Sequence, residues 1–320
     1  MASGTHPNHV KPPFFENPAA LGYGLLFPAL AILLTFKAYP FLLGIWFSLT
    51  NKVVGIEGEF VGLANYLIQL KSDIFWDTAR NTVIFTATAT VFKTVLGMWL
   101  ALILSRKFVF SRATRAIILL PFIVPTVLSV LSWKWMFDAT FSVFNYMLTY
   151  FWRLDIPLLD MNLRGIFDGP ARLQINWLGD SFWAMVSVIT VNVWRGMPFF
   201  AITFLAGLQT VPQDLYDAGD IDGTNGWQRF WYITLPSIKP IVVVVMVFSI
   251  VVTFADFELV WVLTEGGPHN STHLFATYAY QLGMTAGNLG GGAAVALFML
   301  PILALLILWQ LLYLRKEENQ

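Results

Sequence analysis

Six ionisable side chains interrupt stretches of the sequence that are otherwise apolar. They are Lys37, Lys93, Lys134, Arg195, Asp256 and Glu258. A charged side chain in hydrocarbon costs at least about 2–3 kcal/mol, so each of them is a candidate for binding a polar or charged solute. A structural role is also open for each, because a long side chain near the end of an apolar stretch can reach water. Lys93, in mid-stretch, could equally pair with an acid on a neighbouring helix.

Two of these cations stand beside tryptophans. Lys134 lies between Trp133 and Trp135, and Arg195 follows Trp194. Aromatic faces next to a few polar groups are typical of small-molecule sites, and they suit sugars, which present C–H faces and hydroxyl rims. The excess of basic over acidic groups among the six ionisable residues suits an anionic sugar derivative. The substrate-binding hypothesis rests on Trp133, Lys134, Trp194, Arg195, Asp256 and Glu258.

Other kinds of chemistry are excluded by motifs that the sequence lacks. It has no Gly-x-x-x-x-Gly-Lys-Ser/Thr segment, so this chain cannot hold nucleotide phosphates in a P-loop. The absence of cysteine excludes disulfides, thiolate metal sites and cysteine nucleophiles. His269 and His273 have the spacing of a metal-binding pair on a helix, but the residues between them are typical of a turn. No metal site, bound cofactor or catalytic residue is therefore predicted.

The composition shows which elements must position these groups. Of the 320 residues, 57% are hydrophobic and 12% are charged, with a mean hydropathy of +0.66. An average soluble domain has about 25% charged residues, so the chain has too few polar side chains to cover a water-facing surface. The 19 basic and 19 acidic residues balance, which leaves no positive patch for nucleic acid. The sequence predicts a multi-pass membrane protein embedded in the lipid bilayer.

Six apolar segments are long enough to cross a bilayer as helices, since about 20 apolar residues are needed. Prolines interrupt the third segment near its start, and Arg195 with Pro198 interrupts the fourth. We therefore expect an all-α protein with six transmembrane helices. The expected spans are 23–47, 82–104, 116–137, 182–208, 241–263 and 290–314.

The distribution of lysine and arginine predicts the orientation of the chain. The short loop between the second and third spans has four cations and no acid, and cytoplasmic loops are rich in such residues. Successive spans cross the membrane in opposite directions, so Arg315 and Lys316 are expected on the same side as this loop. Both termini are therefore expected in the cytoplasm. We divide the chain into a cytoplasmic tail (1–19), a permease-type transmembrane domain (20–314) and a second tail (315–320). The first tail is expected to be disordered, with a short docking helix as the alternative.

Besides segment 50–79, two further segments are expected on the opposite, outer side. Residues 138–181 combine aromatic and acidic residues, which suits either a surface for a soluble partner or a cap that seals the helix ends. The second segment, 264–289, begins with the turn sequence Glu265-Gly266-Gly267-Pro268. Its amphipathic stretch 275–282 is expected to lie along the membrane interface.

The inner segment 209–240 is too polar to enter the bilayer, yet it is rich in aromatic residues. Pro212 can start a first short helix, Asp222-Gly223 forms a break, and Pro236 and Pro240 are expected to end a second helix. The expected apolar face of that second helix suits insertion into another protein. The alternative is that the helix lies on the lipid headgroups. This face comprises Trp227, Phe230, Trp231 and Ile233.

The same segment resembles the signature of permease subunits of binding-protein-dependent ABC importers. The signature has an acid and two small residues, then Asp-Gly, and then Phe, Ile, Leu-Pro and Pro at fixed intervals. The sequence departs mildly from this signature at three positions. It has Asp217 where the family usually has glutamate, Gly219 where it usually has alanine, and Thr224 where it usually has a smaller residue. The matching residues are Asp217, Ala218, Gly219, Asp222, Gly223, Phe230, Ile233, Leu235, Pro236 and Pro240.

Further phrases extend the resemblance over residues 23–314 and narrow it to the carbohydrate-uptake branch, similar to the first permease subunit of maltose-type importers. They include Gly62-Leu63-Ala64-Asn65-Tyr66 and Thr264-Glu265-Gly266-Gly267-Pro268. The resemblance implies a type I importer fold and a place in the bacterial cytoplasmic (inner) membrane. It also implies four partners: a homologous second permease, a dimer of ATPase subunits that uses ATP and Mg²⁺, an extracytoplasmic solute-binding protein and a carbohydrate substrate.

In that family, segment 209–240 would be the coupling loop that docks on the ATPase. Gly223 would be required because a side chain there would obstruct a tight turn. Two alternatives stay open. One is a permease for a polyamine, an amino acid or a phosphorylated polyol. The other is a secondary transporter, although the internal repeats typical of such proteins are not visible.

Overall fold

The computed structural model describes residues 18–106, 109–153 and 175–318. The expected tail 1–19 therefore lies outside the described residues except for its last two positions. Within the described ranges the chain is helical, with two isolated β-bridges near residues 50–60. Five helices are long and apolar enough to cross a membrane, and a bent helix pair brings the number to as many as six.

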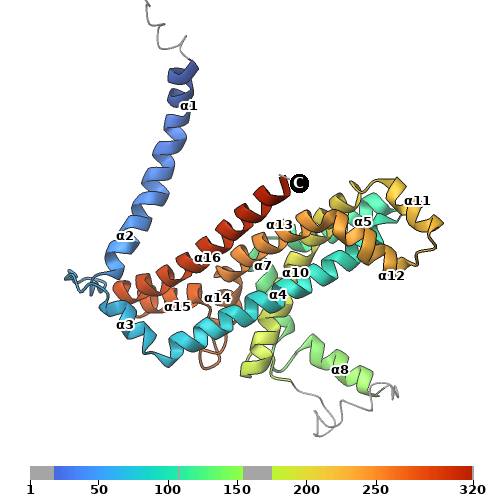
Figure 1. The fold of residues 1–320 in the computed structure, drawn as a ribbon. Helices are drawn as coiled ribbons and strands as arrows, with labels where there is room; N and C mark the ends of the chain where they lie inside the picture. Colours follow the sequence, from blue (N-terminus) through green and yellow to red (C-terminus); the bar gives the residue numbers. More distant parts are fainter. Residues whose placement is uncertain (1–17, 107–108, 154–174, 319–320) are drawn as a thin grey trace, which may run out of the picture.

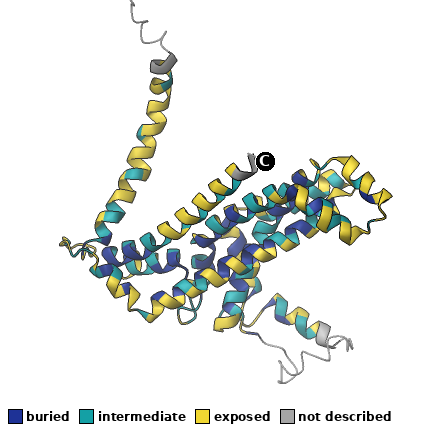
Figure 2. Cartoon of the chain, in the orientation of Figure 1, coloured by how far each residue is buried: buried dark blue, intermediate teal, exposed yellow. Residues whose placement is uncertain are grey.

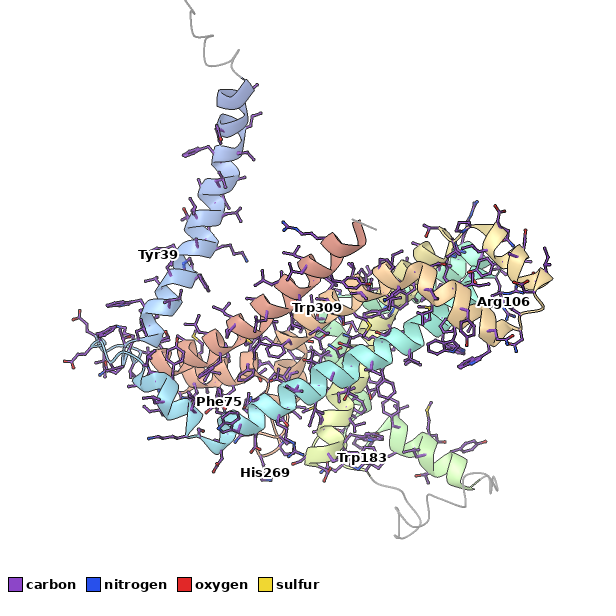
Figure 3. The ribbon with its side chains drawn as sticks, viewed as in Figure 1. Tyr39, Phe75, Arg106, Trp183, His269 and Trp309 are labelled. Atoms are coloured by element: carbon purple, nitrogen blue, oxygen red, sulfur yellow. The ribbon has the colours of Figure 1, made fainter. Side chains whose placement is uncertain are left out.

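The first, second, fourth and sixth expected spans are long helices. The first comprises α1 (Pro18–Leu33), the π-helical turn η2 (Leu34–Ala38) and α2 (Tyr39–Ser48). The second is α4 (Asp73–Ser105), the fourth is α10 (Ser181–Leu208) and the sixth is α16 (Leu289–Glu318). Phe75 and Arg106 mark the two ends of α4 in Figure 3.

The third span is broken, which corrects the expectation of one helix over residues 116–137. It comprises α5 (Ser111–Ile118), α6 (Leu120–Ile123) and α7 (Thr126–Met136), and the chain bends by 88° between α6 and α7. The bend lies at Val124, whose ψ of 135° is extended. A residue before proline avoids the helical region, so Pro125 forces the break.

The fifth span is displaced toward the N-terminus relative to the expected 241–263. A continuous helix runs from Gly226 to Phe254 through α12 (Gly226–Arg229), the π-helical turn η3 (Phe230–Thr234) and α13 (Leu235–Phe254). After a break at residues 255–257, α14 (Glu258–Thr264) follows. The break was not predicted.

Pro236 and Pro240 consequently lie inside this helix, and the expectation that they end a helix is wrong. A π-helical turn stands directly before α13, and another stands directly before the Tyr39-Pro40 start of α2. A proline ring clashes with the carbonyl of the preceding turn, and the wider π-turn makes room for it. The helix therefore continues through the proline.

The apolar residues Phe275 and Tyr278 of the stretch 275–282 are buried and Tyr280 is 38% exposed, which corrects the expectation that the stretch lies along the membrane interface. It forms α15 (Phe275–Tyr280) and the start of the π-helical turn η4 (Gln281–Thr285). The Phe275 ring lies 5.5 Å from Phe75 and 6.0 Å from Phe254, measured between centroids. These rings form a core cluster with Tyr278 and Val295. The apolar face of α15 thus packs against protein rather than lipid.

Two further short helices flank the bundle. They are α3 (Ala64–Leu70) and α8 (Val143–Arg153). The side chain of Asn145 in α8 donates to the Ile175 carbonyl at 2.9 Å and accepts from Trp177 Nε1 at 3.0 Å. These bonds join the two described ends of segment 138–181, while residues 154–174 lie outside the described residues. Whether this segment caps the helices or meets a partner stays a prediction.

The central bundle is built on α4, α10 and α13, which lie against one another (Figure 1). The first span stands away from this bundle, and its side chains are almost all exposed (Figure 2). Its exposed residues include Tyr23, Phe27 and Phe36. The fold class of an all-α membrane protein follows directly. The cytoplasmic placement of both termini and the division into domains stay predictions.

A close backbone contact between η4 and α16 supplies a test of this packing. A Cβ atom at Gly292 would lie 2.6 Å from the Cα of Gly283 and 2.7 Å from the carbonyl oxygen of Ala279. We expect Gly292→Ala to lower the melting temperature in detergent, because such overpacking costs about 1–3 kcal/mol. Gly44→Ala is the matched control, since nothing lies within 4 Å of its Cβ position. Equal melting temperatures for the two variants would contradict the contact.

Candidate functional site

A small cavity lies between α4, α6, α10 and α13 and reaches the break after Phe254. Its volume is about 80 Å³. Phenylalanines, including Phe199, Phe200 and Phe248, form its apolar wall. Its polar wall comes from α4, α10, α13 and the break, and comprises Lys93, Asn192, Arg195, Ser249, Thr253 and Asp256. We call this space the interior polar cavity.

Lys93 enters the cavity from α4 and is only 4% exposed. Its Nζ donates a hydrogen bond to Thr253 Oγ1 at 2.7 Å and lies 5.9 Å from the centre of the Phe200 ring. Its hydrocarbon chain lies over Gly196 of α10, where a Cβ atom would stand 2.6 Å from Lys93 Cδ. Gly196 therefore makes the room that lets a lysine cross between two tightly packed helices.

Asp256 lies in the break between α13 and α14 and is held from two sides. Its Oδ2 accepts from Asn192 Nδ2 at 3.0 Å, and its Oδ1 accepts from the backbone N–H of Leu259 at 3.3 Å. The second bond satisfies an otherwise unpaired N–H in the first turn of α14. The carboxylate also interacts electrostatically with Arg195 and Lys93. In the described part of the chain, neither cation forms a direct ion pair with it.

Three polar atoms at the cavity have no hydrogen-bond partner among the described residues. They are Asn192 Oδ1, Arg195 Nε and Ser249 Oγ. A buried donor or acceptor without a partner costs about 1–3 kcal/mol. Native structures keep few such groups, so a cluster of three around one cavity indicates a place for polar ligand atoms.

The structure brings together only part of the predicted substrate-binding set. Arg195 and Asp256 line the cavity, and Trp194 precedes Arg195 without lining it. The Trp133 and Trp194 rings meet edge to face, 5.4 Å apart between centroids, and Trp133 packs on a core cluster. Lys134 Nζ donates to the Val262 carbonyl at 3.2 Å.

Glu258 also stands apart from the cavity, exposed in the first turn of α14, where an acid complements the helix dipole. The predicted set thus separates into two cavity residues and four residues in other surroundings.

Four polar residues of the cavity lie outside the predicted substrate-binding set: Lys93, Asn192, Ser249 and Thr253. Lys93 was considered as a buried cation but not placed in the substrate set. Asn192, Ser249 and Thr253 are uncharged, and a search for ionisable groups passes over them. The sequence does contain one indication of the polar wall: Ser249 is the polar residue in the otherwise apolar run from Ile241 to Val252.

The second site is the helix pair of segment 209–240. It comprises α11 (Gln213–Ile221) and α12, which continues into η3. Asn225 and Gln228 form a capping box that starts α12, with both hydrogen bonds at 2.9 Å. Arg229 pairs with Asp220 across the two helices, and Tyr216 Oη lies 3.1 Å from Thr234 Oγ1. The pair is therefore a defined hairpin of helices.

Gly223 is required for its backbone conformation. Its φ is +73°, which side-chain-bearing residues rarely adopt, whereas nothing lies within 4 Å of its Cβ position. Glycine is needed here, but the expected reason is wrong. A side chain would have room, and the strain would come from the positive φ angle. Asp222 caps the end of α11 before this turn.

Two departures from the family signature are physically linked. A Cβ atom at Gly219 would lie 2.9 Å from Thr224 Oγ1 and 2.7 Å from Ile233 Cδ1. Thr224 Oγ1 donates to the Gly219 carbonyl at 2.8 Å. The hydroxyl of Thr224 thus occupies space that the alanine methyl of the usual signature would need.

The exposed apolar face of the helix pair differs from the expected one. Trp227 is 71% exposed, Trp231 46% and Tyr232 78%. Phe230 packs instead on a core cluster with Leu235, and Ile233 contacts Gly219. One π-helical turn in this stretch rotates the face relative to the α-helical pattern that we assumed. Among the other signature residues, Asp217, Ala218 and Pro236 are exposed, and Asp217 accepts from Gln213 at 3.0 Å.

The two histidines of segment 264–289 have different surroundings. His269 is exposed, whereas the His273 ring is buried beneath Gly266 and its Nδ1 lies 3.1 Å from Thr277 Oγ1. Burial lowers the pKa of His273 to about 4, because the charged imidazolium loses its hydration. This histidine is therefore a neutral packing residue at physiological pH.

Comparison with known proteins agrees with the fold. The profile of the family described as "Binding-protein-dependent transport system inner membrane component" matches residues 93–318, more than half of the chain. The trehalose/maltose transport system permease protein MalF of Thermococcus litoralis is 34% identical over 280 residues, covering 87% of this chain and 88% of the relative. The sulfoquinovosyl glycerol transport system permease protein SmoG of Agrobacterium fabrum is 32% identical over 280 residues, covering 87% of this chain and 85% of the relative.

A solved structure shows the same fold. A chain of a bacterial ABC transporter involved in the import of the acidic polysaccharide alginate superimposes with a TM-score of 0.74 at 22% identity, covering 92% of this chain and 95% of that one. Fold and comparisons together define the permease subunit of an ABC importer, with sugar permeases among its relatives. The chain belongs to the family of binding-protein-dependent transport system inner membrane components. The resemblance to the carbohydrate-uptake branch and the type I importer fold are confirmed.

The contact between Gly219 and Thr224 can be tested with a double-mutant cycle. We expect Gly219→Ala to lower the melting temperature of the purified protein, and to lower it less when Thr224→Ala is also present. Residues in contact couple by about 0.5–3 kcal/mol. Gly226→Ala is the control, because its Cβ position is open. Strictly additive effects of the two substitutions would show that they do not share the space.

Proposed function

We propose that this chain passes a sugar or sugar derivative across the bacterial cytoplasmic (inner) membrane by alternating access. A solute-binding protein would deliver the sugar, and a homologous second permease would complete the pathway. A dimer of separate ATPase subunits would hydrolyse ATP with Mg²⁺, so this chain itself would bind no cofactor. The helix that runs unbroken from Gly226 to Phe254 is the observation that carries the proposal.

The N-terminal end of that helix carries the proposed contact with the ATPase. Trp227, Trp231 and Tyr232 present a compact aromatic surface next to the α11 hairpin. Large exposed aromatics of this kind are typical anchors in protein–protein interfaces. We assign the coupling role to the signature residues of the same segment: Asp217, Ala218, Gly219, Asp222, Gly223, Phe230, Leu235 and Pro236.

The C-terminal end of the same helix lies at the interior polar cavity. Thr253 bonds Lys93 there, and Asp256 follows directly after the helix ends. A helix transmits a tilt along its length without absorbing it. Movement of the aromatic end by the ATPase would therefore displace Thr253 and Asp256 relative to α4 and α10, which links ATP hydrolysis to the substrate pathway.

The cavity supplies the proposed substrate contacts. We assign Arg195 and Asp256 to the substrate, together with Lys93, Asn192 and Ser249. We assign packing roles to Trp133, Lys134 and Trp194, given their contacts elsewhere, and a role at the N-terminus of α14 to Glu258. Small-molecule pockets usually have about 300–1,000 Å³, so this cavity of about 80 Å³ holds only part of a sugar. The second permease would complete the site.

The experiment that tests the proposal is reconstitution. The chain would be co-expressed with candidate second permease, ATPase and binding-protein subunits and purified through a tag on this chain. We expect the ATPase to co-purify, and ATP hydrolysis in proteoliposomes to rise when the sugar-loaded binding protein is added. A chain that takes up solute without an ATPase would instead be a secondary transporter. Stimulation by a polyamine or an amino acid alone would replace the sugar assignment.

The coupling role generates a sharper prediction at Gly223. We expect Gly223→Asp to leave the complex assembled and ATP hydrolysis active while sugar uptake falls by about tenfold. A side chain at positive φ costs about 1–2 kcal/mol for most residues and less for aspartate, and the added carboxylate would also place a negative charge in the turn of the helix pair.

Gly226→Asp is the matched control for that prediction. Both positions have open space around the Cβ, but Gly226 is helical and tolerates an acid at the start of α12. Normal uptake by the Gly223→Asp complex would refute the assignment of segment 209–240 as the coupling loop.

A further inference from the structure

We propose that the interior polar cavity binds the acidic group of an anionic sugar, and that Arg195 is the residue that selects for this charge. The inference deepens the proposed function and rests on it. It names a substrate class, sugars that carry a carboxylate or sulfonate, as opposed to neutral sugars of the same size.

The ionisable side chains that line the cavity do not balance in charge. Two cations, Lys93 and Arg195, and one carboxylate, Asp256, line the same small space. Their formal sum is one positive charge within the membrane-spanning bundle. An uncompensated charge in such surroundings is strongly unfavourable, so the site gains free energy when an anion enters.

The hydrogen bonds show which cation is available. Lys93 Nζ already donates to Thr253 Oγ1, and the oxygens of Asp256 accept from Asn192 and from the N–H of Leu259. Arg195 differs, because its Nε is buried and has no partner among the described residues. A guanidinium in this state offers the planar donor pair that matches a carboxylate or sulfonate.

Neutral groups around Arg195 suit the rest of a sugar. Asn192 is 8% exposed and Ser249 is 4% exposed, and Asn192 Oδ1 and Ser249 Oγ have no partner among the described residues. Asn192 Oδ1 can accept from a sugar hydroxyl, and Ser249 Oγ can donate or accept. The rings of Phe199 and Phe248, 5.6 Å apart between centroids, offer an apolar surface to C–H groups.

The size of the cavity agrees with an acidic group better than with a whole ring. A carboxylate or sulfonate fits within about 80 Å³, whereas sites for whole small molecules usually have about 300–1,000 Å³. The sugar ring itself would lie outside this space, against the second permease. The competing explanation is an acid of that second permease that neutralises Arg195 and leaves the substrate neutral.

The test uses the complete complex in proteoliposomes and matched sugar pairs. The pairs are glucose with glucuronate, galactose with galacturonate, and glucose with 6-deoxy-6-sulfoglucose, each as monomer and as disaccharide. Uptake and binding-protein-dependent ATP hydrolysis would be measured for both members of every pair. We expect the anionic member of at least one pair to be transported and its neutral counterpart to be transported at least about tenfold less well.

Three variants separate charge selection from structural damage. We expect Arg195→Gln to raise KM for the anionic sugar by roughly tenfold or more, with a smaller change in kcat, because a charged hydrogen bond is lost. Arg195→Lys keeps the charge and should restore most of the affinity. Arg80→Gln is the matched control, because Arg80 is an exposed cation on α4 outside the cavity.

The possible failures are distinguishable. Transport of the neutral member of the pairs, or equal KM values for Arg195→Gln and the unsubstituted complex, would overturn the anionic assignment and leave the sugar importer standing. If no sugar of either kind stimulates ATP hydrolysis, the proposed function itself fails, and the inference fails with it. The pair comparison on the unsubstituted complex decides the charge preference even if the Arg195→Gln complex does not assemble.

Discussion

The carboxylate of Asp256 ties together the helices on which the site depends. It accepts from Asn192 of α10, completes the first turn of α14 through the N–H of Leu259, and attracts Lys93 of α4. It can do so because the chain is not helical at residues 255–257, which lets a polar side chain and free backbone groups meet inside the bundle. In a bilayer such a break is tolerated only where protein or a polar cavity satisfies the backbone. The break thus places Asp256 at the cavity, and Asp256 in turn satisfies a backbone N–H that the break leaves free.

Pro125 and Pro236 shape the bundle in opposite ways, and the backbone before each of them differs. Pro125 follows an extended residue and the chain bends by 88°, so α6 reaches the cavity wall through Phe122. Pro236 follows a π-helical turn and the helix continues. The first arrangement adds Phe122 to the cavity wall, and the second preserves the long helix that joins the cavity to the aromatic surface. Both results depend on local backbone geometry, since the residue type is the same.

The fold class and most spans could be predicted because lipid imposes length and apolarity on each helix separately. The two short helices of segment 209–240 could be predicted because the signature residues lie close together in the chain. The sequence could not show that Phe275 packs on Phe75 and Phe254, because that contact joins residues far apart in the chain. It could not orient Phe230 either, since a single π-helical turn rotates the face. At the cavity, Arg195 and Asp256 were predicted by charge. Asn192 and Ser249 were not, because an uncharged polar side chain in a helix is usually satisfied locally.

The packing around the cavity indicates which parts can move. Between α4 and α10 the contacts are close and involve backbone: a Cβ atom at Gly97 would lie 2.5 Å from Phe200 Cβ, and one at Gly196 would meet Lys93. Helices packed so closely move as one body, because a shift of even a fraction of an ångström would create clashes. The end of α13, in contrast, is joined to that body at the cavity by hydrogen bonds between side chains, from Lys93 to Thr253 and from Asn192 to Asp256. Such bonds can exchange partners with water or with a sugar. A tilt of the helix Gly226–Phe254 would therefore open the cavity along α13 and leave the α4–α10 pair intact.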